Sequence, residues 1–421
     1  MSLPRYAEYR DSGVEWLGEI PGHWLTSKLK WSSSVFSGRN SKSDTGNYPL
    51  FGANGPIGKC EIATFLKPHV LIGRVGSAGA VNYAEGSYGA SDNVLVVREY
   101  SVLVPRFLYY SLIARNFDID VSTTAQPLLT ASQVKDQVVQ LPSEFEQHAI
   151  AIFLDDQSSR INALIAEQQT LLALLAEKRQ ATISHAVTRG LDPNVPMKDS
   201  GIPWLGEVPS HWDVLSLKRD LAFLTSGSRG WAAHYADDGA LFLRIGNLTR
   251  NSAKLDLSDI QRVAQPSGTE GERTRVQAGD LLFSITAYLG SVAVVPADLE
   301  AAFVSQHVAL ARLHGEHFLP LWVAYATLSR LGSTYLANQG YGGAKIQLSL
   351  DDIGGLPITG PPLPEQQAIL DFLEVELQRF DGIIAEVNAA IRLLCERRSA
   401  LISATVTGQF DVRGLSNKLV A

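Results

Sequence analysis

The sequence predicts a mixed α/β fold in which two globular regions are separated by two long antiparallel coiled-coil helices, arranged as a pseudo-two-fold internal repeat. Three observations lead to this prediction. Two sequence blocks occur twice, apolar residues recur at heptad-like spacing behind each globular region, and short apolar runs broken by glycine fill the remainder. A length of 421 residues also exceeds what one ordinary core accommodates, which favours several domains.

Two blocks of sequence are duplicated. The block DSGVEWLGEIPGHW at residues 11–24 returns as DSGIPWLGEVPSHW at residues 199–212, an offset of 188. A second block runs from Glu146-Gln147 to Val187-Thr188 and returns at residues 365–407, an offset of 219. Because a repeat decides the architecture, the two halves are expected to share one frame.

The segments between these blocks differ, and we name them the first insert, residues 25–140, and the second insert, residues 213–360. The second offset exceeds the first by 31 residues, so the second insert is longer, and the two inserts share little sequence. Two shared frames with unlike inserts favour one mechanical task performed twice and one recognition task performed on two targets. The alternative is an old duplication whose middle has drifted neutrally.

Each copy of the second block predicts a helix of about forty residues, near ~60 Å at the usual rise per residue. Apolar residues fall at alternating spacings of three and four, with Gln157 and Gln168 completing the first seam. The predicted seam comprises Ile150, Leu154, Ile161, Leu164, Leu171 and Leu175 in the first helix, and Ile369, Leu373, Phe380, Ile383, Val387 and Leu394 in the second.

The two stripes are expected to pair with each other. Pro142-Ser143 and Pro364 mark the helix starts, while Gly190 and Gly408 mark the ends. A pseudo-two-fold axis across the helices makes the pair antiparallel. The alternative is a long surface helix that packs on its own domain.

These patterns divide the chain into five segments. They are a first globular domain at 1–142, a central helix at 143–190, a second globular domain at 191–362, a C-terminal helix at 363–408 and a tail at 409–421.

Both inserts predict short strands. Apolar runs broken by glycine turns extend over residues 70–81 and 91–98, with a weaker echo at 280–285 and 305–312. Apolar periodicity predicts helices at 106–114 and 318–331. We therefore expect one scaffold in both inserts, with different polar side chains on it.

The composition indicates a soluble globular protein. Apolar residues make up 45% of the chain, the first ten residues lack the apolar core of a signal peptide, and no run is long enough to span a membrane. We expect a cytoplasmic protein. The two cysteines, Cys60 and Cys395, fit packing positions better than a disulfide or metal site.

The net charge of −7 argues against a surface coated in positive charge, although its distribution weakens this objection. Many of the acidic residues lie in the predicted helices. The first insert is slightly basic and the second is about neutral to mildly acidic. A DNA-facing surface on the second insert is therefore expected to be a local patch.

No catalytic motif stands out, and we expect neither a catalytic residue nor a bound metal in this chain. The segment from Gly52 to Lys59 approaches a phosphate-binding loop but has Ala53 and Cys60 where glycine and serine or threonine are needed. The nine histidines form no zinc-binding pattern, and His23 and His211 fit structural residues packed beside their neighbouring tryptophans. Together these absences favour a binding protein.

The inserts carry polar and aromatic residues of the types that contact phosphates or read base edges, arginine for guanine and asparagine or glutamine for adenine. For each of them a solvated loop residue is the alternative. The candidate DNA contacts are Arg39, Asn40, Tyr48, Asn54, Lys59, Arg74, Asn93, Thr124 and Gln126 in the first insert, and Ser228, Arg229, Arg244, Asn247, Arg250, Tyr288, Gln306, His307, Tyr341 and Lys345 in the second. Two unlike readers on a rigid helix pair would sample two short sites roughly one helical turn apart, ~34 Å.

Several motifs together resemble the specificity subunits of type I restriction-modification systems, and the resemblance covers nearly the whole chain. They are the two opening blocks, the turn YPLFGANG at residues 48–55, the Leu-Pro and Glu-Gln helix starts, and the basic helix ends EKR and ERR. Any one of these motifs is unspecific, whereas the combination is specific.

The resemblance implies that residues 1–142 and 191–362 are target-recognition domains, each gripping one half of a bipartite, asymmetric DNA site, with spacer helices between them. It also implies that the helices dock two methyltransferase (M) subunits, which bind S-adenosylmethionine and modify adenine. The complex would then recruit restriction (R) subunits that use ATP and Mg. The chain itself would be non-catalytic and hold no cofactor. The second insert departs from this pattern in lacking an obvious basic excess, so neutralisation of the DNA backbone at this insert would depend on partner subunits.

Two other functions remain open from the sequence. A helical scaffold or adaptor would join two partner subunits without reading DNA. A hidden enzyme would show turnover without any partner.

Overall fold

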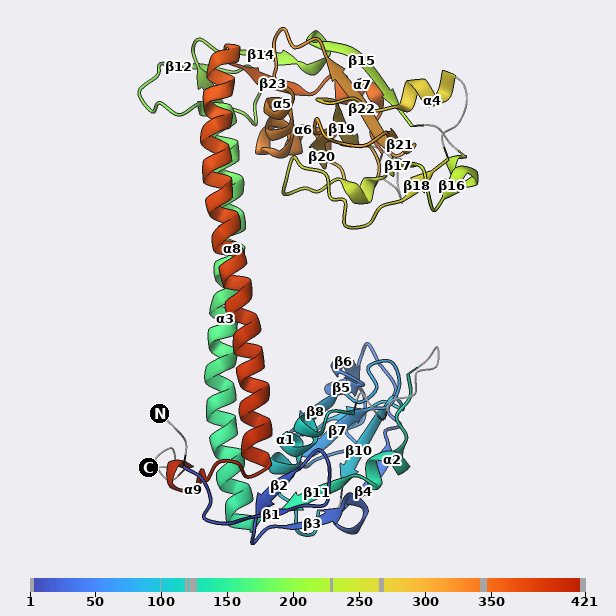
Figure 1. Cartoon of the computed structure of the whole chain (residues 1–421), viewed down its shortest axis with the longest axis vertical. Coiled ribbons are helices and arrows are strands. Elements are labelled where there is room, and N and C mark those ends of the chain that lie inside the picture. Colours follow the sequence, from blue (N-terminus) through green and yellow to red (C-terminus); the bar gives the residue numbers. More distant parts are fainter. Residues whose placement is uncertain are drawn as a thin grey trace. The chain divides into compact units, whose positions relative to one another are not determined.

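A computed structural model describes residues 4–98, 100–117, 120, 127–227, 230–264, 269–340 and 347–416 (Figure 1). The chain divides into two compact units. Unit 1 comprises Met1–Gln169 and Asn388–Ala421, and unit 2 comprises Thr170–Val387. Each unit therefore holds one insert together with a stretch of both long helices.

The two long helices are α3, Glu144–Arg189, and α8, Leu363–Val406. Both begin and end within two residues of the positions that the sequence predicts, and each passes without a break from one unit into the other. Acidic residues occupy both first turns, where carboxylates are favoured by the helix dipole. The boundary between the compact units thus lies inside the helices, not at their ends.

Unit 1 is built on a four-stranded antiparallel sheet of order β4-β10-β7-β8, beside a three-stranded sheet of order β6-β5-β9. Its strands are β1 (Tyr9–Asp11), β2 (Glu19–Pro21), β3 (Leu25–Lys28), β4 (Ser34–Ser37), β5 (Tyr48–Gly52), β6 (Gly55–Cys60), β7 (His69–Gly73), β8 (Val81–Ala84), β9 (Gly89–Ala90), β10 (Val94–Arg98) and β11 (Val138–Leu141). Its shorter helices are α1 (Pro105–Arg115), α2 (Ala131–Lys135) and α9 (Arg413–Ser416).

Unit 2 repeats this plan with a sheet of order β15-β22-β19-β20 and a second sheet of order β16-β18-β17-β21. Its strands are β12 (Met197–Asp199), β13 (Glu207–Pro209), β14 (Asp213–Ser216), β15 (Leu221–Ser226), β16 (Tyr235–Ala236), β17 (Ala240–Leu243), β18 (Arg262–Val263), β19 (Leu281–Ser284), β20 (Val292–Val294), β21 (Ala302–Val304), β22 (Val308–Leu313) and β23 (Pro357–Gly360). Its shorter helices are α4 (Thr269–Thr274), α5 (Pro320–Leu328), α6 (Arg330–Gln339) and α7 (Leu350–Gly354).

The two inserts share one scaffold despite their unlike sequences. Each four-stranded sheet has the same order and the same antiparallel pairing, and in each the neighbouring sheet contributes one parallel pair, β5-β9 or β17-β21. Each insert is also closed by its first and last strands, which pair as β3-β11 and β14-β23. The entry and exit of each insert therefore lie side by side.

One helix differs from its prediction. The stretch predicted as a single helix at 318–331 is two helices, α5 and α6, which meet at Ser329. Ser329 is extended and fully buried, and its hydroxyl accepts the Leu331 backbone N–H as an N-cap. Because serine can cap a new helix, the apolar periodicity continues past a point where the backbone turns.

The buried stripe of each long helix follows a strict alternation of four and three residues. The partly or fully buried positions are Leu154, Ser158, Ile161, Ile165, Gln168, Leu172, Leu175 and Arg179 in α3, and Leu373, Leu377, Phe380, Ile384, Val387, Ile391, Leu394 and Arg398 in α8. Every α8 position lies 219 residues after its α3 counterpart. The duplicated block thus buries the same face in both helices.

Three seam predictions are wrong by one residue. Leu164, Leu171 and Ile383 keep 45%, 38% and 43% of their surface exposed, while the next residue in each case is more buried. The prediction took three residues and then four after Leu154, whereas the structure takes four and then three. Doublets of apolar residues allow either phase, so the spacing alone could not decide between them.

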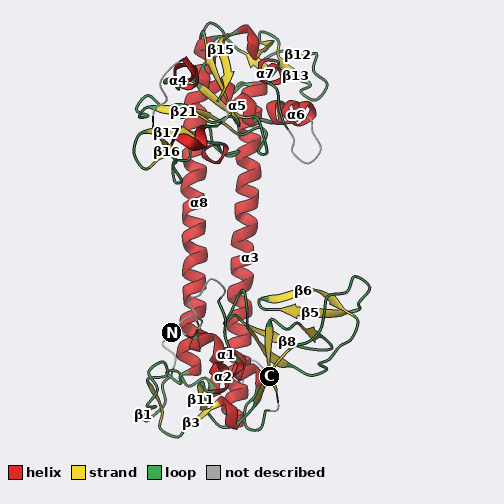
Figure 2. Cartoon of the chain, turned by 90° about the vertical axis from the view of Figure 1, so that its right-hand side faces the viewer, coloured by secondary structure: helices red, strands yellow, loops and turns green. Residues whose placement is uncertain are grey.

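The two helices run antiparallel in each unit, as Figure 2 lets the reader follow. In unit 2 the Arg179 guanidinium near the end of α3 pairs with Asp381 in the first half of α8. In unit 1 the Arg398 guanidinium near the end of α8 donates to the side-chain oxygen of Asn162 in α3. Both members of the second pair are related to the first by the 219-residue offset, so the same contact occurs twice.

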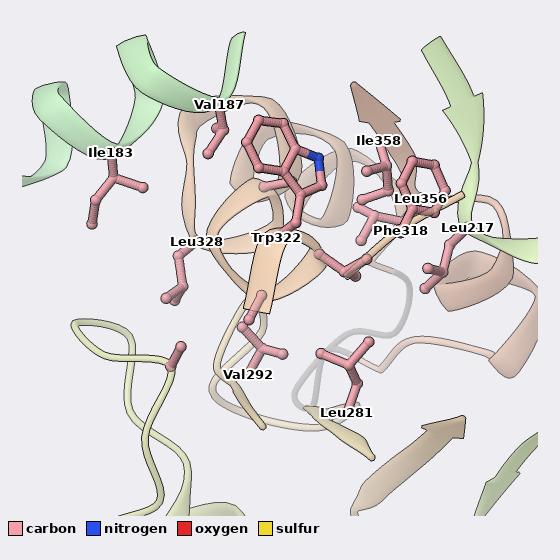
Figure 3. Packing of buried hydrophobic residues seen from close by; sticks show 14 of the residues in the cluster. Ile183, Val187, Leu217, Leu281, Val292, Phe318, Trp322, Leu328, Leu356 and Ile358 are labelled. Carbon is pink, nitrogen blue, oxygen red and sulfur yellow. The ribbon is translucent and has the colours of Figure 1, made fainter. Parts of the chain in front are cut away.

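The ends of the long helices belong to the cores of the inserts. Ile183 and Val187 of α3 pack in unit 2 with Trp322, Phe318 and other core residues of the second insert (Figure 3). Ile150 and Leu154 of α3 and Val406 of α8 pack likewise in the core of unit 1. Each insert is therefore held rigidly on both helices by buried apolar contacts.

We predict that Leu154→Asp and Leu373→Asp each lower the free energy of unfolding by on the order of 3–5 kcal/mol, because each places an unpaired charge at a fully buried position. Chemical denaturation monitored by circular dichroism measures the loss. Leu164→Asp is the matched control, since this leucine is 45% exposed, and we expect a change below about 1 kcal/mol. Equal losses at Leu154 and Leu164 would contradict the assigned phase.

Candidate nucleic-acid interface

The two duplicated blocks meet at the start of each long helix, and we name these contacts the first and second joint. At the first joint the Glu146 carboxylate accepts from His23 Nε2 at 2.8 Å and from Trp24 Nε1 at 3.3 Å. At the second, Glu365 accepts from His211 Nε2 at 2.9 Å and Trp212 Nε1 at 3.1 Å. The histidines are structural, as predicted, and their partner is the glutamate of the other block.

The glutamine beside each glutamate fixes the helix of the insert. Gln147 Oε1 accepts from the Val104 N–H at 2.7 Å, at the N-terminus of α1, and its amide donates to two backbone carbonyls. Gln366 does the same for the Leu319 N–H at 2.9 Å, at the N-terminus of α5. Since neither helix has a side chain of its own as N-cap, each glutamine supplies the missing acceptor.

The opposite end of the other long helix closes each joint. Gln140 Nε2 donates to the Val406 carbonyl at 2.7 Å, and Thr359 Oγ1 donates to the Val187 carbonyl. These two contacts are related by the 219-residue offset. Each joint therefore connects the start of one long helix, the end of the other and one insert.

Hydrogen bonds lower the pKa of Glu146. Burial of this side chain acts in the opposite direction and is the largest single influence, but the bonds from His23, Ser143 and Trp24 together outweigh it. The carboxylate is thus held ionised in a nearly water-free place, and its two oxygens are both used.

Several predicted contact residues gather at one end of the four-stranded sheet of each insert. In the first insert Arg39 follows β4, Arg74 follows β7 and Asn93 precedes β10. In the second insert Tyr288 follows β19, and Gln306 and His307 precede β22. Because neighbouring strands are antiparallel, the last residues of one strand lie beside the first residues of the next, so these positions share one end of the sheet. We name this end the reading end of each insert.

The backbone at the two reading ends is the same while the side chains differ. The Arg74 N–H donates to the Asn93 carbonyl at 2.8 Å, and the Ile285 N–H donates to the His307 carbonyl at 3.1 Å. One scaffold position therefore carries a half-exposed arginine in the first insert and a buried isoleucine in the second. Such substitution on a constant frame is what two readers of different targets require.

The reading end of the second insert contains a pocket of about 280 Å³. Its aromatic wall is formed by Trp231 stacked on Phe242, with ring centroids 5.3 Å apart. Arg244, Gln306 and His307, all predicted as contacts, line its polar side. Gln306 Nε2 lies 3.0 Å from His307 Nε2, so the two side chains orient each other. An aromatic wall with amide, imidazole and guanidinium groups can bind a planar polar ring.

Two further predicted contacts are exposed, Asn54 in the first insert and Arg250 in the second. Asn54 is exposed at the turn between β5 and β6, and the neighbouring Ala53 carbonyl accepts from Asn82. The Arg250 guanidinium lies 5.6 Å from the ring centre of Tyr288, which is 56% exposed. An exposed arginine over an exposed aromatic ring is available to a phosphate.

Two predicted contacts are corrected. Asn40 donates to the Ile62 carbonyl and accepts from the Ala90 N–H, so its amide closes a loop of the first insert. Asn247 is 3% exposed and donates to the Asp256 and Asp259 carbonyls. Asparagine stabilises turns through its own side chain as readily as it binds adenine, and the sequence does not separate these uses.

The remaining predicted contacts are placed elsewhere or lie outside the description. Tyr48 and Lys59 lie on the β5-β6 hairpin, away from its turn. Tyr48 pairs with Cys60, and Lys59 pairs with Pro49. The residues outside the described part of the chain are Thr124, Gln126, Ser228, Arg229, Tyr341 and Lys345.

The sequence reasoning missed the joint residues Glu146, Gln147, Glu365 and Gln366 as a functional set. The available signal was that both blocks repeat together, which indicates that they contact each other. Among the residues that the structure describes, no cluster of three or more His, Cys, Asp or Glu side chains could hold a metal ion. No helix in the same ranges has both the length and the apolar character needed to span a membrane.

We predict that Glu146→Gln lowers the stability of the full chain by about 1–3 kcal/mol at pH 7, because His23 and Trp24 lose a charged acceptor in a buried place. The pKa of Glu146 is depressed in the folded chain, so its stabilisation is present above its ordinary value of 4.5 and is lost as the pH falls through the folded pKa. Denaturation from pH 7 to pH 3 measures both effects. The variant should lose less stability than the wild type over this interval, and parallel curves would contradict the assignment.

Comparison with known proteins yields one family and several relatives. A model of the family described as type I restriction modification DNA specificity domain matches residues 33–173 and 250–392. The EcoBI specificity subunit of Escherichia coli, a type I restriction enzyme subunit, is 22% identical over 328 residues, which cover 73% of this chain and 66% of that protein. The EcoDI specificity subunit of the same organism is 21% identical over 419 residues, covering 94% of this chain and 90% of that protein.

Among solved structures, one similar chain comes from a study of complex assembly and conformational transition of the type I R-M system. The TM-score is 0.69 at 14% sequence identity, with 93% of this chain and 99% of that chain covered. This likeness shows a shared fold.

Proposed function

Because the chain belongs to the family of type I restriction modification DNA specificity domains, we propose that it is the subunit that reads the DNA target of such a system, with one half of a bipartite, asymmetric site bound by each insert. The observation that carries the proposal is the pair of reading ends, in which one backbone presents unlike side chains. A protein reading one palindromic site would need like readers, whereas unlike readers suit an asymmetric site.

The polar groups at the reading ends suit the two kinds of DNA contact. Arg74 and Arg250 can bind phosphates or guanine, and Gln306 can pair with adenine through its amide. The net charge of −7 means that non-specific attraction to DNA comes from these local groups and from partner subunits. We therefore expect weak DNA affinity for the chain alone, with a steep dependence on salt.

We propose in addition that α3 and α8 act as coiled-coil spacers between two target-recognition domains and as the docking surfaces for two methyltransferase subunits. The duplicated joints support this, because the same arrangement at the helix ends occurs twice and could therefore bind two copies of one partner. S-adenosylmethionine would bind the methyltransferase subunits, and ATP and Mg the restriction subunits, which join through the complex. The chain would work in the cytoplasm and contribute no catalytic group.

The scaffold function, without DNA reading, remains the second candidate from the sequence. No particular contact in the structure favours it. It predicts that removing the charges of Arg74, Arg250 and Arg244 together leaves methylation of host DNA unchanged.

We predict that replacing the first insert, residues 25–140, by the corresponding segment of a relative changes one half of the methylated sequence and leaves the other half intact. The exchange points fall where β3 pairs with β11, with Thr26 opposite Gln140, so the graft disturbs one strand pair only. Mapping of methylated adenines in cells that carry the chimera measures the outcome. A change in both halves or in neither would refute the assignment of one half-site to each insert.

We predict that Gln306→Ala relaxes the base preference of the second half-site by about 1–3 kcal/mol, roughly 5-fold to 150-fold, because one bidentate base contact is lost. Arg250→Ala should instead weaken binding to all sequences alike and reduce the salt dependence, as expected for a phosphate contact. Competition binding of the assembled complex to site variants at two salt concentrations distinguishes these results. A loss of preference in the first half-site on Gln306→Ala would show that the residue does not read its own half.

A further inference from the structure

Unit 1 contains a polar pocket that lies away from the reading end, where α1 meets both long helices. Its volume is about 410 Å³. It is lined by Arg106, Tyr109 and Tyr110 of α1, Asp155, Ser158 and Asn162 of α3, and Arg398 of α8, with neighbouring residues. Neither the joints nor the reading ends use these side chains, so the pocket needs a separate explanation.

The charges in the pocket do not balance. Arg106 Nε donates to Asp155 Oδ1 at 2.7 Å, and Tyr110 donates to the same oxygen at 2.6 Å, so this arginine is paired. Arg398 donates to the neutral side chain of Asn162, and no ion pair with a carboxylate is seen for it among the described residues. Two guanidinium groups and one carboxylate leave one positive charge facing the pocket.

The internal repeat provides a comparison at the same positions. In unit 2 the arginine corresponding to Arg398 is Arg179, and it pairs with Asp381, which stands where unit 1 has Asn162. Leu377 of unit 2 replaces Ser158 and is buried in the core, and Leu321 replaces Arg106. Unit 2 therefore neutralises its arginine and fills the space with apolar side chains, while unit 1 does neither.

The Ser158 hydroxyl strengthens the contrast. Ser158 is 9% exposed, and its oxygen is buried without a hydrogen bond of good geometry, although the Tyr110 hydroxyl lies near it. A buried polar atom without a partner costs free energy, and a ligand that offers an acceptor removes that cost. Arg398, Ser158 and the Asn162 amide thus provide donors to the pocket, while its one carboxylate, that of Asp155, already accepts from Arg106 and Tyr110.

We propose that this pocket binds a small organic anion through one phosphate or carboxylate group, held by the guanidinium of Arg398. Arginine binds both groups through paired N–H donors, and the tyrosine rings give the rest of the ligand an apolar wall. The site does not depend on DNA reading. It lies on the contact between α1 and the helix pair, so a bound anion would stabilise unit 1 but not unit 2.

Binding to the full chain tests the proposal, with inorganic phosphate and acetate as separate probes in isothermal titration. We expect saturable binding of one anion per chain, and the probe that binds more tightly identifies the group. Asn162→Asp should weaken binding at least tenfold, and Ser158→Leu should abolish it. Both variants carry the type of residue that unit 2 tolerates at these positions, acidic and leucine respectively, so folding should be retained.

Arg179→Gln is the matched control, because it removes the corresponding guanidinium from unit 2, and phosphate or acetate binding should not change. The proposal is overturned if neither probe binds saturably, or if Ser158→Leu binds as the wild type does. It is also overturned if Ser158→Leu impairs assembly with methyltransferase subunits while the wild type binds neither probe, since the pocket is then a protein contact. DNA methylation patterns are read separately, so failure here leaves the proposed function standing.

Discussion

A glutamate at the first turn of each long helix makes the contacts on which the rest of the structure depends. Glu146 and Glu365 each accept from a histidine and a tryptophan that come from the other duplicated block. Glu146 is 2% exposed, and a carboxylate can remain in so dry a place only because its charge is matched by donors, whereas Glu365 is partly exposed. The neighbouring glutamine then positions the helix of the insert, so a single Glu-Gln dipeptide orients two elements at once.

This arrangement explains why two blocks are duplicated with different offsets. The His-Trp pair and the Glu-Gln pair contact each other in both halves, so a change in either would have to be matched by the other. The inserts meet this frame at their closing strands, at the helix starts held by the glutamines and in the cores that pack on the long helices, and they are free of the constraint elsewhere. A frame with fixed contacts and variable inserts fits a protein that must present new binding surfaces without altering how its parts are joined.

Much of the fold could be predicted from the sequence because its signals are periodic or repeated. The helix bounds follow from capping and breaking residues, and the common scaffold follows from the short apolar runs. The phase of the seam could not be predicted, since Leu164-Ile165 and Leu171-Leu172 offer apolar residues in both registers. The break at Ser329 was hidden for a similar reason, because a buried serine that caps a helix leaves the apolar spacing intact.

For the candidate site, residue type was informative only where the backbone left the side chain exposed. Gln306, His307 and Arg244 meet around one pocket. The Asn247 amide is chemically as suitable for binding a base, but it is buried and forms hydrogen bonds to its own loop. The pocket of unit 1 could be interpreted only by comparing equivalent positions of the two halves, because Asn162 of unit 1 occupies the position that Asp381 has in unit 2. An internal repeat thus acts as a built-in reference for the roles of individual residues.

The pairing of β3 with β11 and of β14 with β23 has a thermodynamic consequence. Each insert is a loop whose two ends are already clamped together, so the entropy of closing it rises only with the logarithm of its length. The second insert can therefore carry 32 additional residues at a cost of only a fraction of a kcal/mol, on the order of 0.2–0.3. Evolution can enlarge one recognition surface while the helices beneath it keep their length, register and partners.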